Sequence, residues 1–498
     1  MAPRLVERMP QRQANFEGAL GRRRMSAYNP TREHVNGLLA LQGPRLLART
    51  RDLARNNPYI FSARDSFMAN AVGAGIVPSW LDVTPRQKSK LEKAWLTWTD
   101  EADYDGVCDL YGLQALVAAA LFEAGECFVR LLRSEGPSGT LQLRLIESEQ
   151  CPVDLTRPAA NGHQIRSGIE FDATGRRVAY WFYRHHPGDS TESWKSADHI
   201  RLPADEILHL YRPTRAGQIR GAPWIAAAVV KAFMLDKYDD AELDRKGTAA
   251  LFAGFITTPV RGGASPLAGA KGELDSPGVA IAGMQPGTMQ ILEPGEDIKF
   301  SEPADVGGQY ESFEYRTILQ LCAATGTPYT NVTGDLKAAN YSSLRAGMLE
   351  YRRRLEQLQH NTLVFQFCRP VAAVWVKQAA LSGELNLPAI RTDLRRYTSI
   401  KWIPPRFEWV DPLKDRKAEE VAVANGWKSR SDVIEAEGYD AEQVDARIAA
   451  DQERAKRYGI GPFPRPAKAA APTDPNADEL GLDPSGPTPT DPAQEDAA

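Results

Sequence analysis

Acidic side chains recur at helical spacing near the middle of the chain. Asp236, Asp240 and Asp244 are four residues apart, and Asp239 stands beside them. Clustered carboxylates can hold the metal ions that cleave nucleic acids, but these acids follow one long predicted helix that has no strand scaffold to make them converge. Like charges one turn apart destabilise a helix by roughly a few tenths of a kcal/mol. We therefore expect either a solvated helix face or acids that face a shared channel or a neighbouring subunit's bases.

The residue types of familiar catalytic and metal sites occur without the spacing that those sites need. There is no HExxH motif, no CxxC pair, no phosphate-binding P-loop and no GxSxG elbow. An odd, scattered set of cysteines predicts reduced thiols and argues against structural zinc. The sequence thus predicts no catalytic residue, no metal and no cofactor. The residues concerned are His34, His163, His185, His186, His199, His209 and His360, and Cys108, Cys127, Cys151, Cys322 and Cys368.

The composition is that of a globular protein rather than a nucleic-acid-binding polycation. The 498 residues carry a net charge of −4, and 25% of them are charged. A chain of this length holds about three domains. DNA contact would have to come from local patches or from geometry. A signal-peptide core and an apolar run of about 20 residues are both missing, so we expect a protein made in the cytosol, with no membrane partner.

A helix, a polar loop and a long helix follow one another between residues 313 and 381. Gly326 and Pro328 end the first helix, and turn-forming residues fill 329–340. The long helix would span roughly 60 Å at about 1.5 Å per residue, and Pro370 should kink it near residues 365–369. Its apolar positions step by four and three, which predicts a buried seam: Leu344, Met348, Tyr351, Leu355, Leu358, Thr362 and Phe365.

The preceding part of the chain alternates between helical and strand patterns. Helices are predicted on both sides of the Asn56-Asn57-Pro58 break, with Phe61, Phe67, Met68 and Val72 as a buried face after it. A period of two then predicts strands, with a hairpin connection at 172–175. This is a mixed α+β region that ends near Gly221. The predicted helices are 91–99 and 110–122, and the predicted strands are 126–133, 140–147, 168–171, 177–184 and 206–211.

Two long helices enclose a segment of short strands and turns. Pro223 is predicted to open a helix that reaches residue 250, because proline is favourable at the first helical position. Residues 252–306 read as a small β module, and a second helix covers 310–325. Further on, residues 411–458 are charged and helical. Residues 461–498 are rich in proline and acids, which predicts disorder, and the arginine-rich first 24 residues predict a frayed arm or a contact with DNA or an acidic neighbour.

Six segments, in this order and at this spacing, resemble the lambda-type phage portal family over about residues 30–460. The resemblance implies a helix-rich α+β portal fold that assembles as a ring. The segments are RDLARNNPYIFSARDSFMANAVGAGI (51–76), RAGQIRGAPW (215–224), RKGTAALFAGFITT (245–258), LEPGEDIKFSEP (292–303), TGTPYTNVTGDLKAANYSSLRAGMLEYRR (325–353) and WVDPLKDRKAE (409–419).

The resemblance also implies a division of labour along the chain. About a dozen copies, a homododecamer, would surround a channel at one capsid vertex. Terminase would drive double-stranded DNA through it, and connector proteins would attach later. The implied parts are a basic arm (1–24), the wing (25–222), a first stem helix (223–251), the β-rich clip (252–309), a second stem helix (310–326), the tunnel loop (327–342), a kinked wing helix (343–382), a connection (383–410), the helical crown (411–460) and an acidic tail (461–498).

The resemblance finally suggests which side chains meet the DNA. Dense basic contacts would hold DNA through counterion release, so an acid-lined stem with sparse bases at the loop would let it slide. We expect the stem acids Asp236, Asp240 and Asp244 along the channel, and at the tunnel loop Lys337, Asn340, Tyr341, Ser342 and Arg345, the last at its edge or bracing it. The implied partners are terminase large subunit, adaptors, major capsid and scaffold proteins, in the virion and, during assembly, the host cytoplasm. The alternatives are another ring-forming connector or minor capsid protein, and a metal-dependent DNA-processing enzyme.

Overall fold

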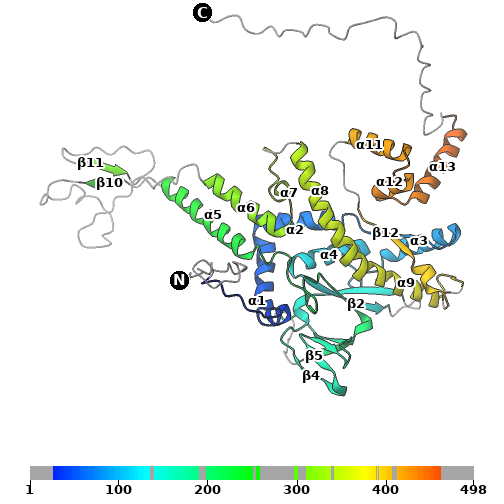
Figure 1. Cartoon of the computed structure of the whole chain (residues 1–498), viewed down its shortest axis with the longest axis horizontal. Coiled ribbons are helices and arrows are strands. Elements are labelled where there is room, and N and C mark those ends of the chain that lie inside the picture. The colour runs from blue at the N-terminus through cyan, green and yellow to red at the C-terminus, as the bar shows by residue number, and fades with distance from the viewer. Residues whose placement is uncertain are drawn as a thin grey trace, which may run out of the picture. The chain divides into compact units, whose positions relative to one another are not determined.

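The computed structural model describes residues 26–134, 140–189, 198–250, 254–257, 297–300, 310–337, 341–388, 390, 392–405 and 412–460. Its architecture is helix-rich α+β, as the sequence predicted (Figure 1). The chain divides into two compact units, residues 1–416 and residues 417–498. The predicted basic arm, most of the predicted β insert and the acidic tail lie outside the described residues.

Two helices open the first unit, and a single buried asparagine separates them. Helix α1 spans Val35–Asn56 and helix α2 spans Pro58–Ala71. The backbone N–H of Asn57 donates to the Leu53 carbonyl at 3.0 Å, while its side-chain oxygen accepts from the N–H of Ile60 at 2.8 Å. One residue thus ends α1 and caps α2, which lets the chain turn with few unpaired backbone groups. Of the predicted buried face, Phe67 and Val72 are buried, whereas Phe61 is exposed.

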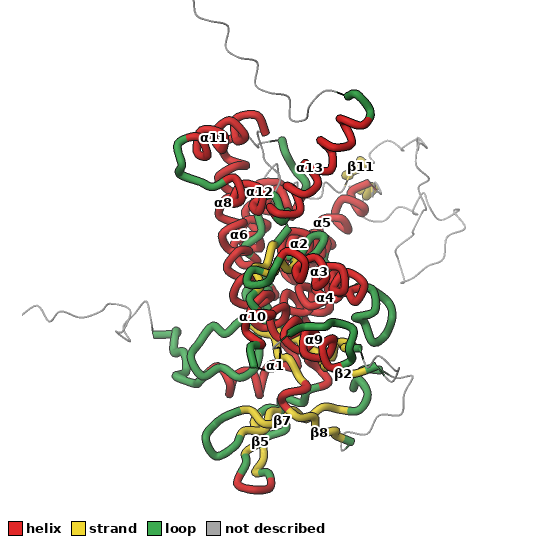
Figure 2. The backbone as a smooth tube through the Cα atoms, turned by 90° about the vertical axis from the view of Figure 1, so that its right-hand side faces the viewer, coloured by secondary structure: helices red, strands yellow, loops and turns green. Residues whose placement is uncertain are grey.

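Strands then build two antiparallel sheets. The central strand β2 (Glu126–Arg133) lies between β3 (Leu141–Ile146) and β9 (Ile207–Tyr211). The second sheet runs in chain order and includes the hairpin that the sequence predicted; β5, β7 and β8 are labelled together in Figure 2. The predicted strands are confirmed to within about a residue. The second sheet consists of β4 (Arg157–Pro158), β5 (Gln164–Arg166), β6 (Ile169–Phe171), β7 (Arg177–Tyr183) and β8 (His199–Pro203).

A pairing between distant segments closes the first unit. Strand β1 (Val77–Trp80) pairs antiparallel with β12 (Ile400–Ile403). Around it, the indole of Trp95 packs against four other indoles, at centroid distances of 4.8 to 6.2 Å. Large aromatic groups dominate the energetics of such a core. The indoles around Trp95 are those of Trp80, Trp98, Trp375 and Trp402, and the helices that pack here are α3 (Pro85–Thr99), α4 (Leu110–Glu123), α9 (Arg369–Leu381) and α10 (Leu394–Thr398).

The two long helices flanking the insert are α5 (Val229–Ala250) and α6 (Tyr310–Thr325). Helix α5 begins at Val229, six residues later than predicted, and Pro223 lies outside it. The backbone N–H of Trp224 instead donates to the Phe122 carbonyl at the end of α4, at 3.2 Å. This tertiary contact holds 224–228 as turns. Of the insert, the structure describes the strand pair β10 (Gly254–Thr257) and β11 (Asp297–Phe300).

The long helix after the loop changes its winding where a proline kink was predicted. The short helix α7 (Tyr329–Thr333) comes first, then α8 (Tyr341–Leu358), a π-helical stretch η6 (Gln359–Cys368) and α9. Pro370 lies in the first turn of α9, directly after the π-helical stretch, with which α9 is continuous. The wider π turns rotate the following residues, so Phe365 is 60% exposed while Leu363, Val364 and Phe367 are buried. The predicted seam is therefore buried from Tyr351 to Thr362, half-buried at Leu344 and Met348, and wrong at Phe365.

Three helices follow in the last described stretch. They are α11 (Pro412–Ala424), α12 (Arg430–Ala436) and α13 (Ala441–Arg457). Their helical character agrees with the charged, periodic pattern of 411–458. Among the described residues, no helix has both the length and the apolar character required to cross a lipid bilayer.

Candidate functional site

The antiparallel helix pair α5 and α6 is the feature on which the functional interpretation rests. The ring of Tyr238 on α5 stacks on that of Tyr310, with centroids 5.7 Å apart, and packs on Phe313 at 4.7 Å. The Tyr310 hydroxyl donates to Asp239 at 3.0 Å. The two helices run side by side (Figure 1). The arrangement predicted for residues 223–250 and 310–325 is therefore present over the described length.

The pair is joined at its base to the body of the first unit. The indole N–H of Trp224 donates to the Thr325 carbonyl at 2.6 Å, and the Arg212 guanidinium lies 4.5 Å over the Trp224 ring. Apolar side chains of both helices enter the main core: Val229, Ala232 and Leu235 from α5, and Ile318, Leu321 and Cys322 from α6. The start of α5 and the end of α6 are thus fixed at neighbouring points.

The three acids predicted to line a channel differ in their surroundings. Asp236 is half-buried and accepts a hydrogen bond from the Asn57 side-chain amide at 2.6 Å. Burial raises the pKa of Asp236, and the nearby carboxylates of Asp239 and Asp240 add to this, against the opposing effect of Asn57. Asp240 and Asp244 are exposed and form no ion pair within the described residues. Only these two carboxylates are free to face a channel or a neighbour.

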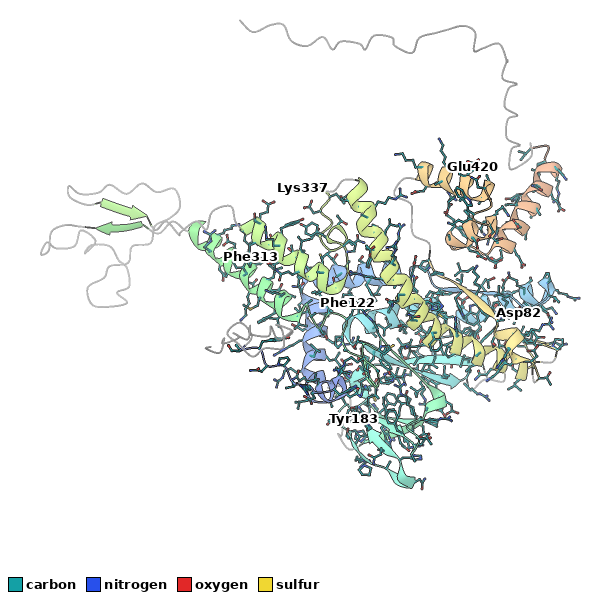
Figure 3. All side chains as sticks on the ribbon, in the orientation of Figure 1. Asp82, Phe122, Tyr183, Phe313, Lys337 and Glu420 are labelled. Atoms are coloured by element: carbon teal, nitrogen blue, oxygen red, sulfur yellow. The ribbon has the colours of Figure 1, made fainter. Side chains whose placement is uncertain are left out.

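The predicted loop residues are placed only in part. Lys337 is exposed, at the end of the described loop before α8 (Figure 3), and its backbone N–H donates to Asp335 at 2.9 Å. Gly334 has φ of 71°, a left-handed conformation that favours glycine. Asn340 lies outside the described residues. Of Tyr341 and Ser342 the structure describes only the backbone, at the start of α8.

Arg345 has a definite partner. Its guanidinium forms an ion pair with Asp415, in the first turn of α11, at 2.8 Å. Both roles predicted for Arg345, at the edge of the channel or bracing the loop, stay predictions, because this contact involves neither. No hydrogen bond or ion pair within the described residues links the loop to the acids of α5.

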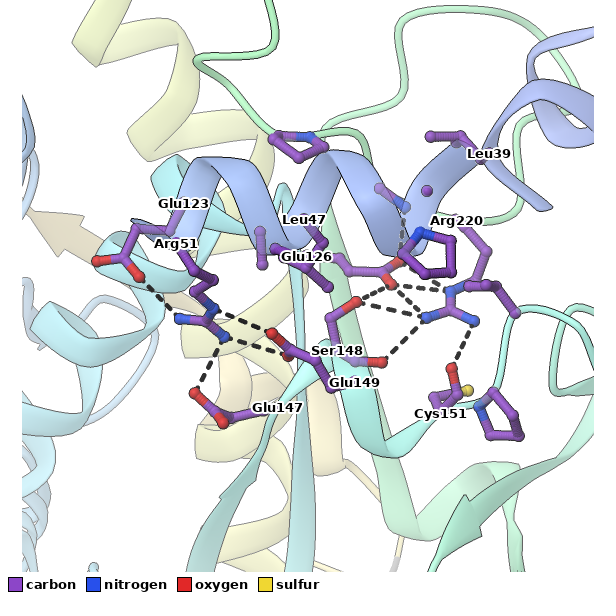
Figure 4. Close-up of a pocket in the computed structure, with 18 of the residues that line it drawn as sticks. Leu39, Leu47, Arg51, Glu123, Glu126, Glu147, Ser148, Glu149, Cys151 and Arg220 are labelled. Carbon is purple, nitrogen blue, oxygen red and sulfur yellow. Dashed lines mark hydrogen bonds and ion pairs between the residues drawn. The ribbon is translucent and has the colours of Figure 1, made fainter. Parts of the chain in front are cut away.

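Sequence reasoning missed a buried polar network in the first unit. The Oε1 atom of Glu126 on β2 accepts from Nη2 and Nε of Arg220 at 2.5 and 2.8 Å and from the Ser148 hydroxyl at 2.6 Å. Its Oε2 atom accepts from the backbone N–H of Gly221 at 2.6 Å. His209 on β9 lies 3.1 Å from the same Oε2 atom. Arg220 also donates to two backbone carbonyls. Figure 4 shows the Glu126–Arg220 pair at the wall of a cavity of about 880 Å³.

The network fixes the charges of its members. Burial disfavours an ionised Glu126, but Arg220 and His209 outweigh this effect and lower the pKa of the carboxyl group. Burial also lowers the pKa of His209, to about 4, despite the opposing carboxylate. Near neutral pH the site is an ion pair with a neutral imidazole beside it. Because Arg220 and His209 reach Glu126 from two other parts of the chain, we interpret the network as a structural tie between β2, β9 and the segment before α5.

The same cavity holds a second charged cluster, around Arg51. Its guanidinium contacts Glu123 at 2.8 Å, Glu147 at 3.0 Å and Glu149 at 3.1 Å (Figure 4). Glu147, Glu149 and His186 lie close enough together to ligate a cation. The guanidinium already supplies positive charge to both carboxylates, so the cluster needs no metal to balance it. No local pattern predicts this convergence, because Arg51 lies 98 positions from Glu149.

Comparison with known proteins decides the family. The family model of the phage portal protein, lambda family, matches residues 21–359. The chain belongs to the lambda family of phage portal proteins. A probable portal protein of Halomonas phage phiHAP-1 is 29% identical over 408 residues, covering 80% of this chain and 77% of that one. Portal protein B of Escherichia phage lambda is 22% identical over 496 residues, covering 90% of each chain.

A solved structure is also similar to this portal protein. The neck of an empty gene transfer agent particle matches with a TM-score of 0.47 and 16% identity, covering 84% of this chain and 94% of that one. The family match confirms the resemblance stated from the six sequence segments. Portal proteins are structural components of phage particles.

Proposed function

We propose that this portal protein assembles as a closed ring of about a dozen copies at one capsid vertex. The ring encloses the channel through which terminase packages double-stranded DNA and through which the DNA later leaves. Connector or adaptor proteins attach to it, and major capsid and scaffold proteins surround it during assembly in the host cytoplasm. The observation that carries the proposal is the antiparallel pair α5 and α6 on either side of an insert, in a chain of the portal family.

The parts of the chain take the roles that the family resemblance implied. Residues 25–222 form the wing, α5 and α6 form the stem, and residues 252–309 form the clip that meets terminase and later the connector. Residues 327–342 form the tunnel loop, and α8, η6 and α9 form the wing's long helix. The anchoring of both stem helices near Trp224 supports this division, because the insert follows the other end of α5 and precedes the other end of α6 in the chain.

DNA can slide through the proposed channel only if the channel wall binds it weakly. A wall that neutralised many phosphates would bind DNA through counterion release. The exposed carboxylates of Asp240 and Asp244 supply negative charge, and Lys337 supplies an isolated base at the loop. We assign Asp236 a structural role instead, because Asn57 holds its carboxylate at 2.6 Å. Arg345 braces α8 against α11 through Asp415.

The alternative of a metal-dependent DNA-processing enzyme has less support. Such a site needs carboxylates that converge on one point. Asp236 faces Asn57 and Asp239 faces Tyr310, while Asp240 and Asp244 are exposed. Two of the four acids are thus held by other side chains of the subunit, so the four carboxylates do not form one open cluster. The alternative of another connector protein is opposed by the match to the portal family over residues 21–359.

Two measurements test the proposal. Negative-stain imaging of the purified chain without DNA should give annular particles with a central hole, and a chain that remains a single globule under assembly conditions contradicts the proposal. The substitution Lys337→Glu should change DNA packaging or retention while rings still form, because Lys337 is exposed and its only described contact is through its backbone. Unchanged DNA yield and retention would remove Lys337 from the channel.

A further inference from the structure

A second cavity of the first unit lies where the end of α6 meets the junction of α8 and η6. Its volume is about 740 Å³, and the described residues that line it include no aspartate and no glutamate. The side chains that decide what it can bind are those of Arg212, Arg354, Trp224 and Phe365. We call this cavity the α6–α8 groove. It shares no lining residue with the cavity around Glu126.

The two arginines of the α6–α8 groove carry positive charge that the described residues do not balance. Arg212 and Arg354 are both exposed, and neither forms an ion pair within the described part of the chain. The Arg212 guanidinium lies 4.5 Å over the Trp224 ring, which orients it without neutralising its charge. The adjacent Arg353, by contrast, pairs with Glu350 at 2.9 Å. A concave surface with two such guanidinium groups and no acid of its own favours a ligand that carries carboxylates.

The end of α6 accounts for one of these arginines. A cation near the carboxyl end of a helix is favourable, and Arg354 lies there, since a Cβ at Gly326 would come within 2.8 Å of its Nη1 atom. This structural role predicts that Arg354 supports folding. It explains neither the second arginine, Arg212, nor the exposed ring of Phe365 in the same groove.

The α6–α8 groove also offers backbone acceptors. The last four carbonyls of a helix have no partner within that helix. At the end of α6 the Thr325 carbonyl accepts from the Trp224 indole at 2.6 Å, and the Cys322 carbonyl accepts from a following backbone N–H at 2.8 Å. The carbonyls of Ala323 and Ala324, which line the groove, accept no hydrogen bond from the described residues. They suit the N–H groups of a peptide, whereas the sugar-phosphate backbone of DNA has no N–H to donate.

An exposed aromatic ring gives the α6–α8 groove an apolar contact. The ring of Phe365 is 60% exposed and lies in the wall of the groove, because the π-helical turns move it out of the buried seam. An aliphatic side chain that covered it would remove apolar surface from water. A cavity of this size holds a small ligand or a short run of side chains, whereas a DNA duplex is too thick to enter it. The charge, the acceptors and the apolar ring together fit a peptide strand.

We propose that the α6–α8 groove binds an acidic peptide segment of a partner protein. Carboxylates of the segment pair with Arg212 and Arg354, and an aliphatic side chain between them covers Phe365. The carbonyls of Ala323 and Ala324 accept N–H groups of the peptide backbone. This site goes beyond the proposed channel and does not depend on it, because every group it uses belongs to one subunit.

Fluorescence anisotropy of a labelled peptide tests the class of ligand. The probe is the peptide Glu-Asp-Leu-Glu-Leu-Asp, added to the full chain. It should bind saturably, and its affinity should fall as the salt concentration rises. A peptide with serine in place of each leucine, and one with lysine in place of each acid, should both bind at least about tenfold more weakly.

Substitutions in the groove test its location. Arg212→Gln and Arg354→Gln should each weaken binding of the probe by about tenfold or more, because hydrogen bonds between charged groups are strong. Arg354→Lys keeps the charge but loses the planar fork of donors, so it should retain part of the affinity. The matched control Arg353→Gln, outside the groove, should leave binding unchanged.

A second pair of variants tests the apolar contact. Phe365→Ala should weaken binding of the probe. Leu381→Ala removes a side chain that is 69% exposed at the end of α9, outside the groove, and should not change it. Circular dichroism of each variant confirms its fold.

Several results would overturn the proposed peptide site. They include no binding of the probe by the parent chain, and equal affinity in the parent chain and the two arginine-to-glutamine variants. A short DNA duplex whose binding is lost in both variants, while the peptide does not bind, would assign the groove to nucleic acid. Binding of the probe by single copies but not by rings separated by size-exclusion chromatography would assign it to a second copy. A chain that never forms rings contradicts the proposed function alone.

Discussion

Asn57 donates its side-chain amide to the carboxylate of Asp236 across 2.6 Å, which ties the break between α1 and α2 to the first stem helix. The same side chain caps α2 through Ile60, and its backbone closes α1 through Leu53. One fully buried residue thus joins two helix ends to α5, in addition to the contacts at Trp224 and in the apolar core. Any change at Asn57 should affect two helix ends and one carboxylate together.

The substitution Asn57→Ala should destabilise the protein by about 2 kcal/mol. Loss of a helix cap costs roughly 1 kcal/mol, and Asp236 also loses its donor. Urea unfolding measures the change. The neighbouring Asn56 is the matched control, because it is exposed and bonds only to Asp52 on its own helix. Asn56→Ala should change stability by less than about 0.5 kcal/mol, and equal effects at the two positions would contradict this account.

The substitution Asp236→Asn should stabilise the protein at neutral pH. The pKa of Asp236 is raised in the folded state, so the folded protein binds this proton more tightly than the unfolded chain does. At neutral pH the charged carboxylate therefore destabilises the wild-type protein. As pH falls through the folded pKa toward about 3.9, protonation of Asp236 removes this effect and stability rises. The asparagine keeps an oxygen for Asn57 without the charge. Its advantage in melting temperature should be present at pH 7 and shrink toward pH 4, whereas Asp244→Asn should show neither effect.

Acid should weaken the protein through His209 before the carboxylates are protonated. Its folded pKa of about 4 lies below the value of about 6.5 in an unfolded chain. Between these values the unfolded state takes up a proton that the folded state refuses, so stability falls as pH drops from about 6.5 to 4. In His209→Gln this dependence should flatten, while the exposed His360→Gln should keep the wild-type slope. Parallel slopes in all three proteins would exclude His209 as the cause.

Removing one member of the Glu126–Arg220 pair should cost far more than removing both. Arg220→Met leaves a buried carboxylate without its cation and should destabilise by about 3–5 kcal/mol. Adding Glu126→Leu should recover a large part of that loss, since no buried charge remains. The exposed pair of Arg353 and Glu350 provides the comparison, where Arg353→Met should cost less than about 1 kcal/mol. A double variant less stable than Arg220→Met would contradict the prediction.

The side chain of Gln366 in the π-helical stretch forms two hydrogen bonds to the backbone of β9, and these bonds should contribute to the stability of the fold. Its side-chain oxygen accepts from the N–H of Tyr211 at 2.9 Å, and its amide donates to the Tyr211 carbonyl at 3.0 Å. Gln366→Leu leaves both backbone groups of an edge strand without these partners and should destabilise by about 1–3 kcal/mol. Gln357→Leu, at an exposed position on α8, should have little effect in the same unfolding experiment.

Local patterns predicted the strands between residues 126 and 211 well, and the reasons are local. Residues 126–133 alternate at a period of two, and the Asp172–Gly175 turn has the chemistry of a hairpin, so strand type and connection follow from neighbours in sequence. The long helix was predicted with a constant step. The π-helical turns break that step, which is why Phe365 was expected in the seam and is exposed.

What the sequence could not predict depends on partners far away in the chain. Asp236 and Asp240 are equivalent in a linear pattern, but Asn57, 179 positions away from Asp236, distinguishes them. Glu126 was correctly expected on a strand, yet nothing local says that Arg220, 94 positions on, would meet it. Long-range pairs of this kind decide which candidate side chains are structural and which are free to act.

The hydrogen bond between Trp224 and Thr325 joins positions 101 apart in sequence. The chain between them consists of α5, the insert and α6. A force on the insert is therefore shared by the two helices, which join the rest of the first unit at neighbouring points. Because the rings of Tyr238 and Tyr310 stack between α5 and α6, we expect the two helices to move together rather than to separate. In the proposed ring, a load that terminase applied to the insert would therefore reach the rest of the subunit through both helices at once.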